Sequence, residues 1–263
     1  KGEWGTSSAQ IHNLLPDSIL KDVSPDFLSD LIKKGALYRV MDHGDSAPTC
    51  CVWYSCYKGC YFAYREYYQP NALISHHRKN ISEYSEGEYY MGNYADPSIF
   101  KTTSQKLGGF WSVADEYLDS KLDSPTIAWI PADNNEYANR NRISELLVRD
   151  PTCKHPLTGE LGAPRFYFLA KTPDHPYGIS HLITQIKIAK RESLGTYNGK
   201  VIYGDEREKS IEDHAYDTLR YFVSIHGSSK TVPAKPASAN SFLGIKKSIK
   251  KMRQMLQLQG RVA

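Results

Sequence analysis

The sequence predicts an α/β protein built on a mixed β-sheet with helices on both faces. Segments with strand and helix character alternate along most of the 263 residues, which is the pattern of α/β folds. Three strand-like segments follow one another over 37–68, and the tight turn at Lys58-Gly59 makes this part an antiparallel meander. Helical segments separate the later strands, as parallel pairing requires.

The first elements have clear boundaries. Ser24 is suited to cap a helix over 24–35, with Pro25 at its first position and Gly35 beyond its end. We expect residues 1–35 to approach the sheet without joining it. The meander strands (37–42, 50–57 and 60–68) are rich in aromatic and β-branched residues.

The remaining elements follow from hydrophobic periodicity and turn residues. We predict strands over 89–95, 126–130 and 165–170, helices over 72–85, 137–148, 180–192 and 211–225, a loop and helix over 104–120, and an exposed loop over 150–164. Beyond them, 228–241 resembles a linker and 246–258 a basic amphipathic helix.

Composition is ordinary for a globular protein, with 40% hydrophobic and 24% charged residues. No apolar run approaches the roughly 20 residues of a membrane span, and we expect no signal peptide. The five cysteines form no pair of C-x2-C motifs, so we expect no zinc site and infer a reducing compartment.

Charge is unevenly distributed. Residues 218–263 hold nine Lys or Arg and no acid, whereas the first 217 residues carry 24 basic and 29 acidic residues, a net of −5. A basic tail indicates either a polyanionic partner, an arm that docks on an acidic surface, or a solvated extension.

Three aspartates are candidates for a metal site. Asp42 and Asp96 each follow a predicted strand, and Asp213 lies in the first turn of the last helix. If the two strands are parallel neighbours, both carboxylates emerge at the sheet edge where α/β proteins bind ligands. Mg2+ and Mn2+ prefer oxygen ligands, and two such ions about 4 Å apart support phosphodiester hydrolysis.

Simpler interpretations stay open. Asp42 could be a turn residue, Asp96 could start the next turn, and Asp213 could be a helix N-terminal acid. A helical projection places Asp213, Asp217 and Arg220 opposite the apolar stripe, a face that is usually solvated. Weaker site candidates are Asp45, Glu66, His43 and His214.

Other sequence features bear on nucleic-acid binding and on nucleotide hydrolysis. Asn139-Arg140-Asn141-Arg142 and Lys101 could contact a nucleic-acid backbone. No G-x-x-x-x-G-K-[ST] motif occurs, so we expect no ATP hydrolysis by this chain.

Several motifs together resemble the C-terminal nuclease domain of the large terminase subunit of tailed bacteriophages. The most specific is the nine-residue run Asp213-His214-Ala215-Tyr216-Asp217-Thr218-Leu219-Arg220-Tyr221, similar to that family's last helix. Many relatives carry two adjacent aspartates there, where this chain has Asp213 and His214. The other motifs are Gly2-Glu3-Trp4, Asp42-x-Gly44, Arg65-Glu66-Tyr67-Tyr68, Ala95-Asp96-Pro97-Ser98, Trp129-Ile130-Pro131-Ala132, Asp150-Pro151 and His155-Pro156-x-Thr158-Gly159.

The resemblance implies a ribonuclease H-like fold over 37–227, preceded by a linker (1–36) from an ATPase domain outside this chain and followed by a flexible linker and basic tail (228–263). It implies an endonuclease that cuts concatemeric double-stranded DNA with two Mg2+ or Mn2+ ions held by Asp42, Asp96 and Asp213. The implied partners are DNA, the portal protein, the small terminase subunit and the ATPase domain, in the cytoplasm of an infected bacterium.

Two alternatives remain at this point. The first is a transposase, integrase or junction resolvase on the same fold, and the second is a non-catalytic DNA- or protein-binding module whose acids are structural.

Overall fold

The computed structural model describes residues 9–106, 109–197 and 199–226. The predicted linker at 228–241, the predicted basic helix at 246–258 and the motif Gly2-Glu3-Trp4 lie outside these ranges. Within them, no helix is both long and apolar enough to cross a bilayer.

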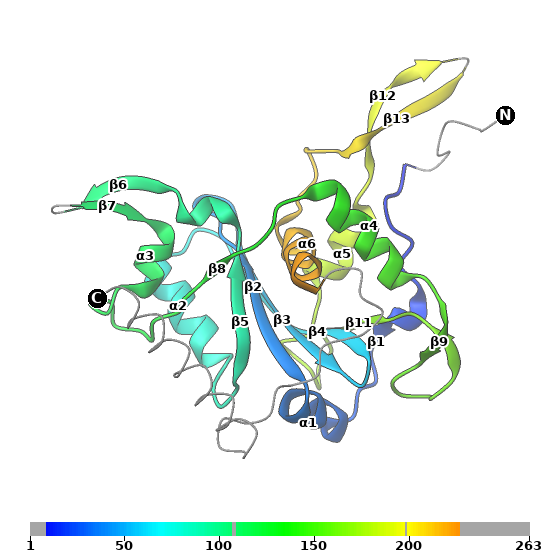
Figure 1. Ribbon diagram of the computed structural model, residues 1–263, viewed down its shortest axis with the longest axis horizontal. Coiled ribbons are helices and arrows are strands. Elements are labelled where there is room, and N and C mark those ends of the chain that lie inside the picture. Colours follow the sequence, from blue (N-terminus) through cyan, green and yellow to red (C-terminus); the bar gives the residue numbers. More distant parts are fainter. Residues whose placement is uncertain (1–8, 107–108, 198, 227–263) are drawn as a thin grey trace, which may run out of the picture. The chain divides into compact units, whose positions relative to one another are not determined.

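A seven-stranded mixed sheet forms the centre of the fold (Figure 1), with the strand order β1-β11-β4-β3-β2-β5-β8. Antiparallel pairs join β2 to β3 and β3 to β4, which confirms the meander, and the other neighbours are parallel. The strands are β1 (Ile19–Leu20), β2 (Ala36–Asp42), β3 (Thr49–Tyr57), β4 (Cys60–Gln69), β5 (Tyr90–Ala95), β8 (Ile130–Pro131) and β11 (Phe166–Leu169).

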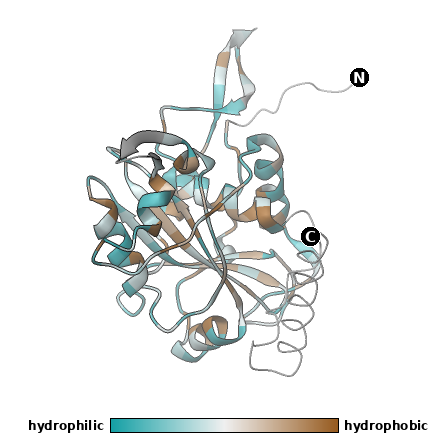
Figure 2. Cartoon of the chain, turned by 60° about the vertical axis from the view of Figure 1, so that its left-hand side comes forward, coloured by the Kyte–Doolittle hydropathy of each residue, from teal (hydrophilic) through white to brown (hydrophobic). Residues whose placement is uncertain are grey.

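Helices cover both faces of the sheet, as the sequence predicted. On one face lie α1 (Pro25–Lys34), α2 (Ile74–Glu83) and α3 (Val113–Leu118), and on the other α4 (Glu136–Leu147), α5 (His181–Ile188) and α6 (His214–His226). Successive side chains of a strand point to opposite faces, so Tyr38 and Val40 of β2 pack towards α6 while Leu37 and Met41 pack on the opposite side. Figure 2 shows the hydrophobic colour concentrated in the central strands and on the helices that cover them.

Every residue of β2 and β3 is buried, as expected for strands with both faces covered. The five cysteines are buried free thiols on β3, β4 and a peripheral strand. The Sγ atoms of Cys60 and Cys153 lie 3.8 Å apart. Burial raises the pKa of the Cys51 and Cys60 thiols to about 12.

The structure differs from the sequence expectations in several places. Residues 1–35 were expected to stay outside the sheet, but β1 pairs with β11. The strand expected over 126–130 is reduced to β8, and the helix expected over 180–192 ends at Ile188. Three two-stranded hairpins replace loops or helix ends: β6 (Thr102–Lys106) with β7 (Gly109–Ser112), β9 (Asp150–Lys154) with β10 (Leu161–Ala163), and β12 (Arg191–Tyr197) with β13 (Lys200–Arg207).

Arg78 fixes the irregular segment between α3 and β8. Its side chain on α2 is fully buried, and its guanidinium donates to the main-chain carbonyls of Glu116, Asp119, Ser124 and Pro125. A buried guanidinium must place its N–H groups on acceptors. Here carbonyl oxygens fill that role, and the segment that leads to β8 is held against α2.

Candidate active site

The ends of two adjacent parallel strands bring Asp42 and Asp96 together. β2 pairs in parallel with β5, and the Asp96 N–H donates to the carbonyl of Met41 at 3.1 Å. Asp42 is the last residue of β2, while Asp96 follows β5 and caps the short 3-10 helix η2 (Pro97–Phe100). The two strands are thus the parallel neighbours that the sequence argument required as its condition, and both carboxylates lie at the carboxyl edge of the sheet.

Helix α6 lies against this edge: its first residue, His214, contacts Asp42, and Tyr221, two turns further on, contacts Asp96. Its buried residues come from more than one side of the helix and include Ala215, Leu219, Arg220 and Tyr221. Arg220 is only 3% exposed, which argues against the alternative that this polar face is solvated. The helix packs against the sheet, α4 and α5, which leaves the polar side facing protein groups.

His214 holds the carboxylate of Asp42. The imidazole Nδ1 lies 2.8 Å from Asp42 Oδ2, and this contact raises the pKa of His214. Burial raises the pKa of Asp42 to about 6; repulsion by Asp217 and Asp96 acts in the same direction, and the hydrogen bond from His214 opposes it. The buried end of β2 thus carries an acid that is costly to ionise without a nearby cation.

Asp96 has a different environment. The Tyr221 hydroxyl donates to Asp96 Oδ2, and the Ser98 N–H donates to Oδ1. Burial opposes ionisation of Asp96, but these hydrogen bonds outweigh it and lower its pKa. Tyr221 therefore holds Asp96 as a carboxylate next to the less acidic Asp42.

A guanidinium from the β12–β13 hairpin binds the remaining two acids. Arg207 contacts Asp213 Oδ2 through Nη2 at 2.6 Å and Asp217 Oδ1 through Nη1 at 3.0 Å. Arg220 adds a second contact to Asp217 Oδ1 at 2.9 Å. Burial raises the pKa of Asp213, with repulsion from Asp217 next, and Arg207 counteracts both.

The donor set suits a hard divalent cation. Carboxylate oxygens are the ligands that Mg2+ and Mn2+ prefer, and the mutual repulsion of Asp42, Asp96 and Asp217 is what a bound cation would relieve. Across the described ranges, no three His, Cys, Asp or Glu side chains are arranged to hold one ion together. The carboxylate oxygens of the cluster instead contact other side chains, among them His214 and Arg207. A bound metal ion would have to replace some of these contacts.

Of the weaker candidates, His214 belongs to this group through its contact with Asp42, whereas Glu66, Asp45 and His43 lie outside it. Glu66 faces α5, where its carboxylate accepts the N–H groups of Ser180, His181 and Leu182. Asp45 is exposed, and His43 lies against Thr49 and Tyr117. Of the residues expected to contact nucleic-acid backbone, Arg140 is buried and Lys101 is exposed.

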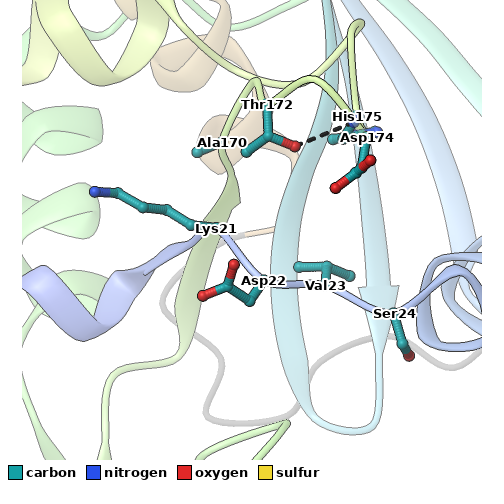
Figure 3. Close-up of a pocket in the computed structure, with 8 residues that line it drawn as sticks. All are labelled: Lys21, Asp22, Val23, Ser24, Ala170, Thr172, Asp174 and His175. Atoms are coloured by element: carbon teal, nitrogen blue, oxygen red, sulfur yellow. Dashed lines mark hydrogen bonds between the residues drawn. The ribbon is translucent and has the colours of Figure 1, made fainter.

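A pocket of about 360 Å³ opens elsewhere on the same edge of the sheet (Figure 3), where β1 and β11 end. Its wall includes Lys21, Asp22 and Asp174, and the His175 N–H donates to the Thr172 hydroxyl at 3.1 Å. Strands β4 and β3 separate β11 from β2. The pocket shares no lining residue with the carboxylate cluster.

Two residues near the carboxylates were not singled out in the sequence. Arg207 lies at the end of a hairpin that was not predicted, although Asn198-Gly199 is a typical hairpin turn. Gln185, on α5, accepts two N–H groups at the start of α6. Neither contact could be read from spacing along the chain.

No protein-family model and no curated protein sequence matches this chain. Among solved structures, the large terminase from a thermophilic bacteriophage matches with a TM-score of 0.54 and 15% identity, covering 82% of this chain and 44% of that one. The chain shares its fold with a phage large terminase. It spans less than half the length of that protein, and its mixed sheet with helices on both faces is ribonuclease H-like, as the resemblance implied.

The same phage terminase in complex with ATP-gamma-S, in another crystal form, matches with a TM-score of 0.51 and 15% identity over 78% of this chain and 42% of that one. The nuclease domain of the P22 large terminase gives a TM-score of 0.48 and 13% identity, covering 84% of this chain and 94% of that domain. At 15% identity, the two matches with TM-scores above 0.5 establish the fold and no more.

Proposed function

We propose that this chain is the metal-dependent endonuclease part of a viral DNA-packaging terminase and cuts concatemeric double-stranded DNA. The observation that supports this function is the meeting of Asp42 and Asp96 at the ends of adjacent parallel strands, opposite the acids at the start of α6. This is an arrangement that can present several oxygen ligands at one point of a rigid sheet.

Asp42, Asp96 and Asp213 are the residues that would hold two Mg2+ or Mn2+ ions. Two bound ions supply an acidified water nucleophile and stabilise charge on the attacking and leaving oxygens of the phosphodiester. Asp217 is the competing candidate for the third ligand, because its charge contributes to the raised pKa of Asp42.

The chain's other residues hold these acids in place. His214 orients Asp42, and Tyr221 orients Asp96, each through a hydrogen bond to one carboxylate oxygen. Arg207 and Arg220 balance the negative charge of Asp217. With a pKa of about 6, Asp42 is mostly ionised above neutral pH, the form that binds a metal ion.

The partners in this proposal come from the family resemblance. They are double-stranded DNA, the portal protein, the small terminase subunit and an ATPase domain, and the setting is the cytoplasm of an infected bacterium. The basic segment 218–263 would add sequence-independent attraction for the DNA backbone.

The test is cleavage of supercoiled plasmid in Mg2+, Mn2+ and EDTA, with wild type, Asp96→Asn and Asp22→Asn compared. The control replaces an exposed carboxylate near the ends of β1 and β11, so it has the same change of charge at the same sheet edge. We expect metal-dependent nicking and linearisation by wild type and the control, and none by Asp96→Asn.

Two further variants decide the third ligand. Loss of cleavage in Asp213→Asn but not in Asp217→Asn would support the assignment, and the opposite result would transfer the role to Asp217. Strand transfer or junction-specific cutting would favour a transposase or resolvase. Absence of cutting together with absence of a Mn2+-induced rise in melting temperature would favour a non-catalytic binding module.

A further inference from the structure

The start of α6 is capped by a residue from another helix. Gln185 of α5 is 4% exposed. Its side-chain Oε1 accepts the N–H of Ala215 at 2.8 Å and that of Tyr216 at 3.0 Å. Its Nε2 donates to the Tyr68 hydroxyl at 3.3 Å. The first N–H groups of a helix have no partner within the helix, so Gln185 satisfies two of those at the start of α6.

Asp213 occupies the position directly before α6, from which a side chain normally caps the helix. It directly precedes α6, and its carbonyl accepts the N–H of Asp217 at 2.7 Å. An aspartate at this position usually accepts the second or third N–H of the helix with its carboxylate. Those are the N–H groups of Ala215 and Tyr216, which Gln185 already binds. The Asp213 carboxylate instead contacts Arg207 at 2.6 Å.

Helix α5 is itself fixed to the sheet by a side-chain cap. The Glu66 carboxylate of β4 accepts three N–H groups at the start of α5, at 2.8 to 3.0 Å. The Tyr68 ring, two residues further along β4, stacks on His181 with ring centroids 4.0 Å apart. A continuous set of side-chain contacts therefore leads from β4 through α5 to the first turn of α6.

We propose that Gln185 is a positioning residue that caps α6 in place of Asp213 and so leaves the Asp213 carboxylate available to the cluster of acids. Without the Gln185 amide, we expect the Asp213 side chain to turn back onto its own helix and accept these two N–H groups, as an aspartate before a helix usually does. The metal-binding role assigned to Asp213 rests on the proposed function, whereas the replacement of Asp213 by Gln185 as the cap of α6 does not.

Amide hydrogen exchange in EDTA tests, without any metal, whether Gln185 replaces Asp213 as the cap of α6. We expect the Ala215 and Tyr216 amides to stay protected in wild type and in Asp213→Ala, because Gln185 caps them in both. Protection should persist in Gln185→Met, through Asp213, and be lost in the Gln185→Met/Asp213→Ala double variant. Loss of protection in Asp213→Ala alone would overturn the proposal, and this variant keeps Gln185 even if Gln185→Met does not fold.

Mn2+ titration by calorimetry tests the consequence for the acids. Outer partners of metal ligands typically affect affinity about 10- to 100-fold, so we expect at least about a tenfold weaker Kd in Gln185→Met. Gln185→Glu, which keeps an acceptor for both N–H groups, should restore it. The matched control is Ile186→Val, a fully buried neighbour on α5, which should lower the melting temperature without changing the Kd.

The two proposals fail in different ways. If wild type binds no Mn2+, the metal centre of the proposed function is wrong, and the exchange experiment still decides whether Gln185 replaces Asp213 as the cap. If wild type binds Mn2+ and Gln185→Met binds it equally well, the positioning role is wrong and the metal centre stands.

Discussion

Replacing Asp42 with Asn should stabilise the metal-free protein, although this removes the residue placed at the centre of the candidate site. Asp42 is 9% exposed, and its pKa of about 6 shows that the fold favours the protonated acid. Above that pH the folded protein must carry a buried negative charge. Asparagine has nearly the same shape, keeps an acceptor oxygen for His214 and carries no charge.

The size of the effect follows from linkage. A raised folded-state pKa contributes stability at low pH that is lost as the pH rises from the unfolded to the folded pKa. A shift from 3.8 to about 6 corresponds to about 3 kcal/mol at pH 8 and to less than about 1 kcal/mol at pH 4. Burying the amide NH2 group of Asn costs about 1 kcal/mol, which leaves a gain of about 2 kcal/mol, or about 4–8 °C in Tm, at pH 8.

The assay is thermal melting of wild type and Asp42→Asn at about pH 8 and pH 4, in EDTA and in Mn2+. In EDTA the variant should melt higher at pH 8, and the difference should nearly vanish at pH 4. At a Mn2+ concentration of 100 times its Kd, the free energy of unfolding should rise by about 2.7 kcal/mol for wild type and by little for the variant. At pH 8 wild type should then melt at a higher temperature than the variant. A variant that melts below wild type at pH 8 in EDTA would refute the reasoning.

Three further substitutions test other contacts. Glu66→Gln replaces the carboxylate that accepts the first N–H groups of α5 with a neutral amide, and it should lower the free energy of unfolding by about 1–2 kcal/mol in thermal melting. An unchanged Tm would contradict the role of Glu66 in fixing α5 to the sheet. Arg78→Met leaves main-chain carbonyls without their donor and should cost about 3 kcal/mol or more in urea denaturation, whereas a loss below about 1 kcal/mol would mean that water replaces the guanidinium. Arg207→Met frees Asp213 and leaves Asp217 with its contact to Arg220, so the melting temperature in EDTA should fall while the rise on adding Mn2+ increases; a smaller rise would show that Arg207 supports metal binding.

The sequence was sufficient for the features that depend on local pattern. The meander over 37–68 was predicted because its strands and its Lys58-Gly59 turn are all encoded within short windows. The proximity of Asp42 and Asp96 was predicted because each ends a strand, and parallel strands align their ends. These inferences required no knowledge of side-chain contacts.

Features that depend on distant contacts were not predicted. Amphipathic analysis assumes one buried face, and it failed for α6 because sheet, helices and the Arg207 guanidinium surround that helix. Arg140 was expected at the surface because of its charge, but it is 3% exposed on α4. The contact between Gln185 and α6 joins residues 30 and 31 positions apart, a separation that has no signature in the sequence.

The burial of all five cysteines makes chemical modification of this protein dependent on its opening motions. The thiolate is the form that attacks alkylating reagents, and burial raises the pKa of four of the thiols: Cys50, Cys51, Cys56 and Cys60. Cys50, Cys51 and Cys56 lie on a central strand, whereas Cys153 lies on β9, outside the main sheet, and contacts Cys60 of β4. The rate at which each thiol reacts therefore reports how often the part of the fold around it opens, and no engineered cysteine is needed.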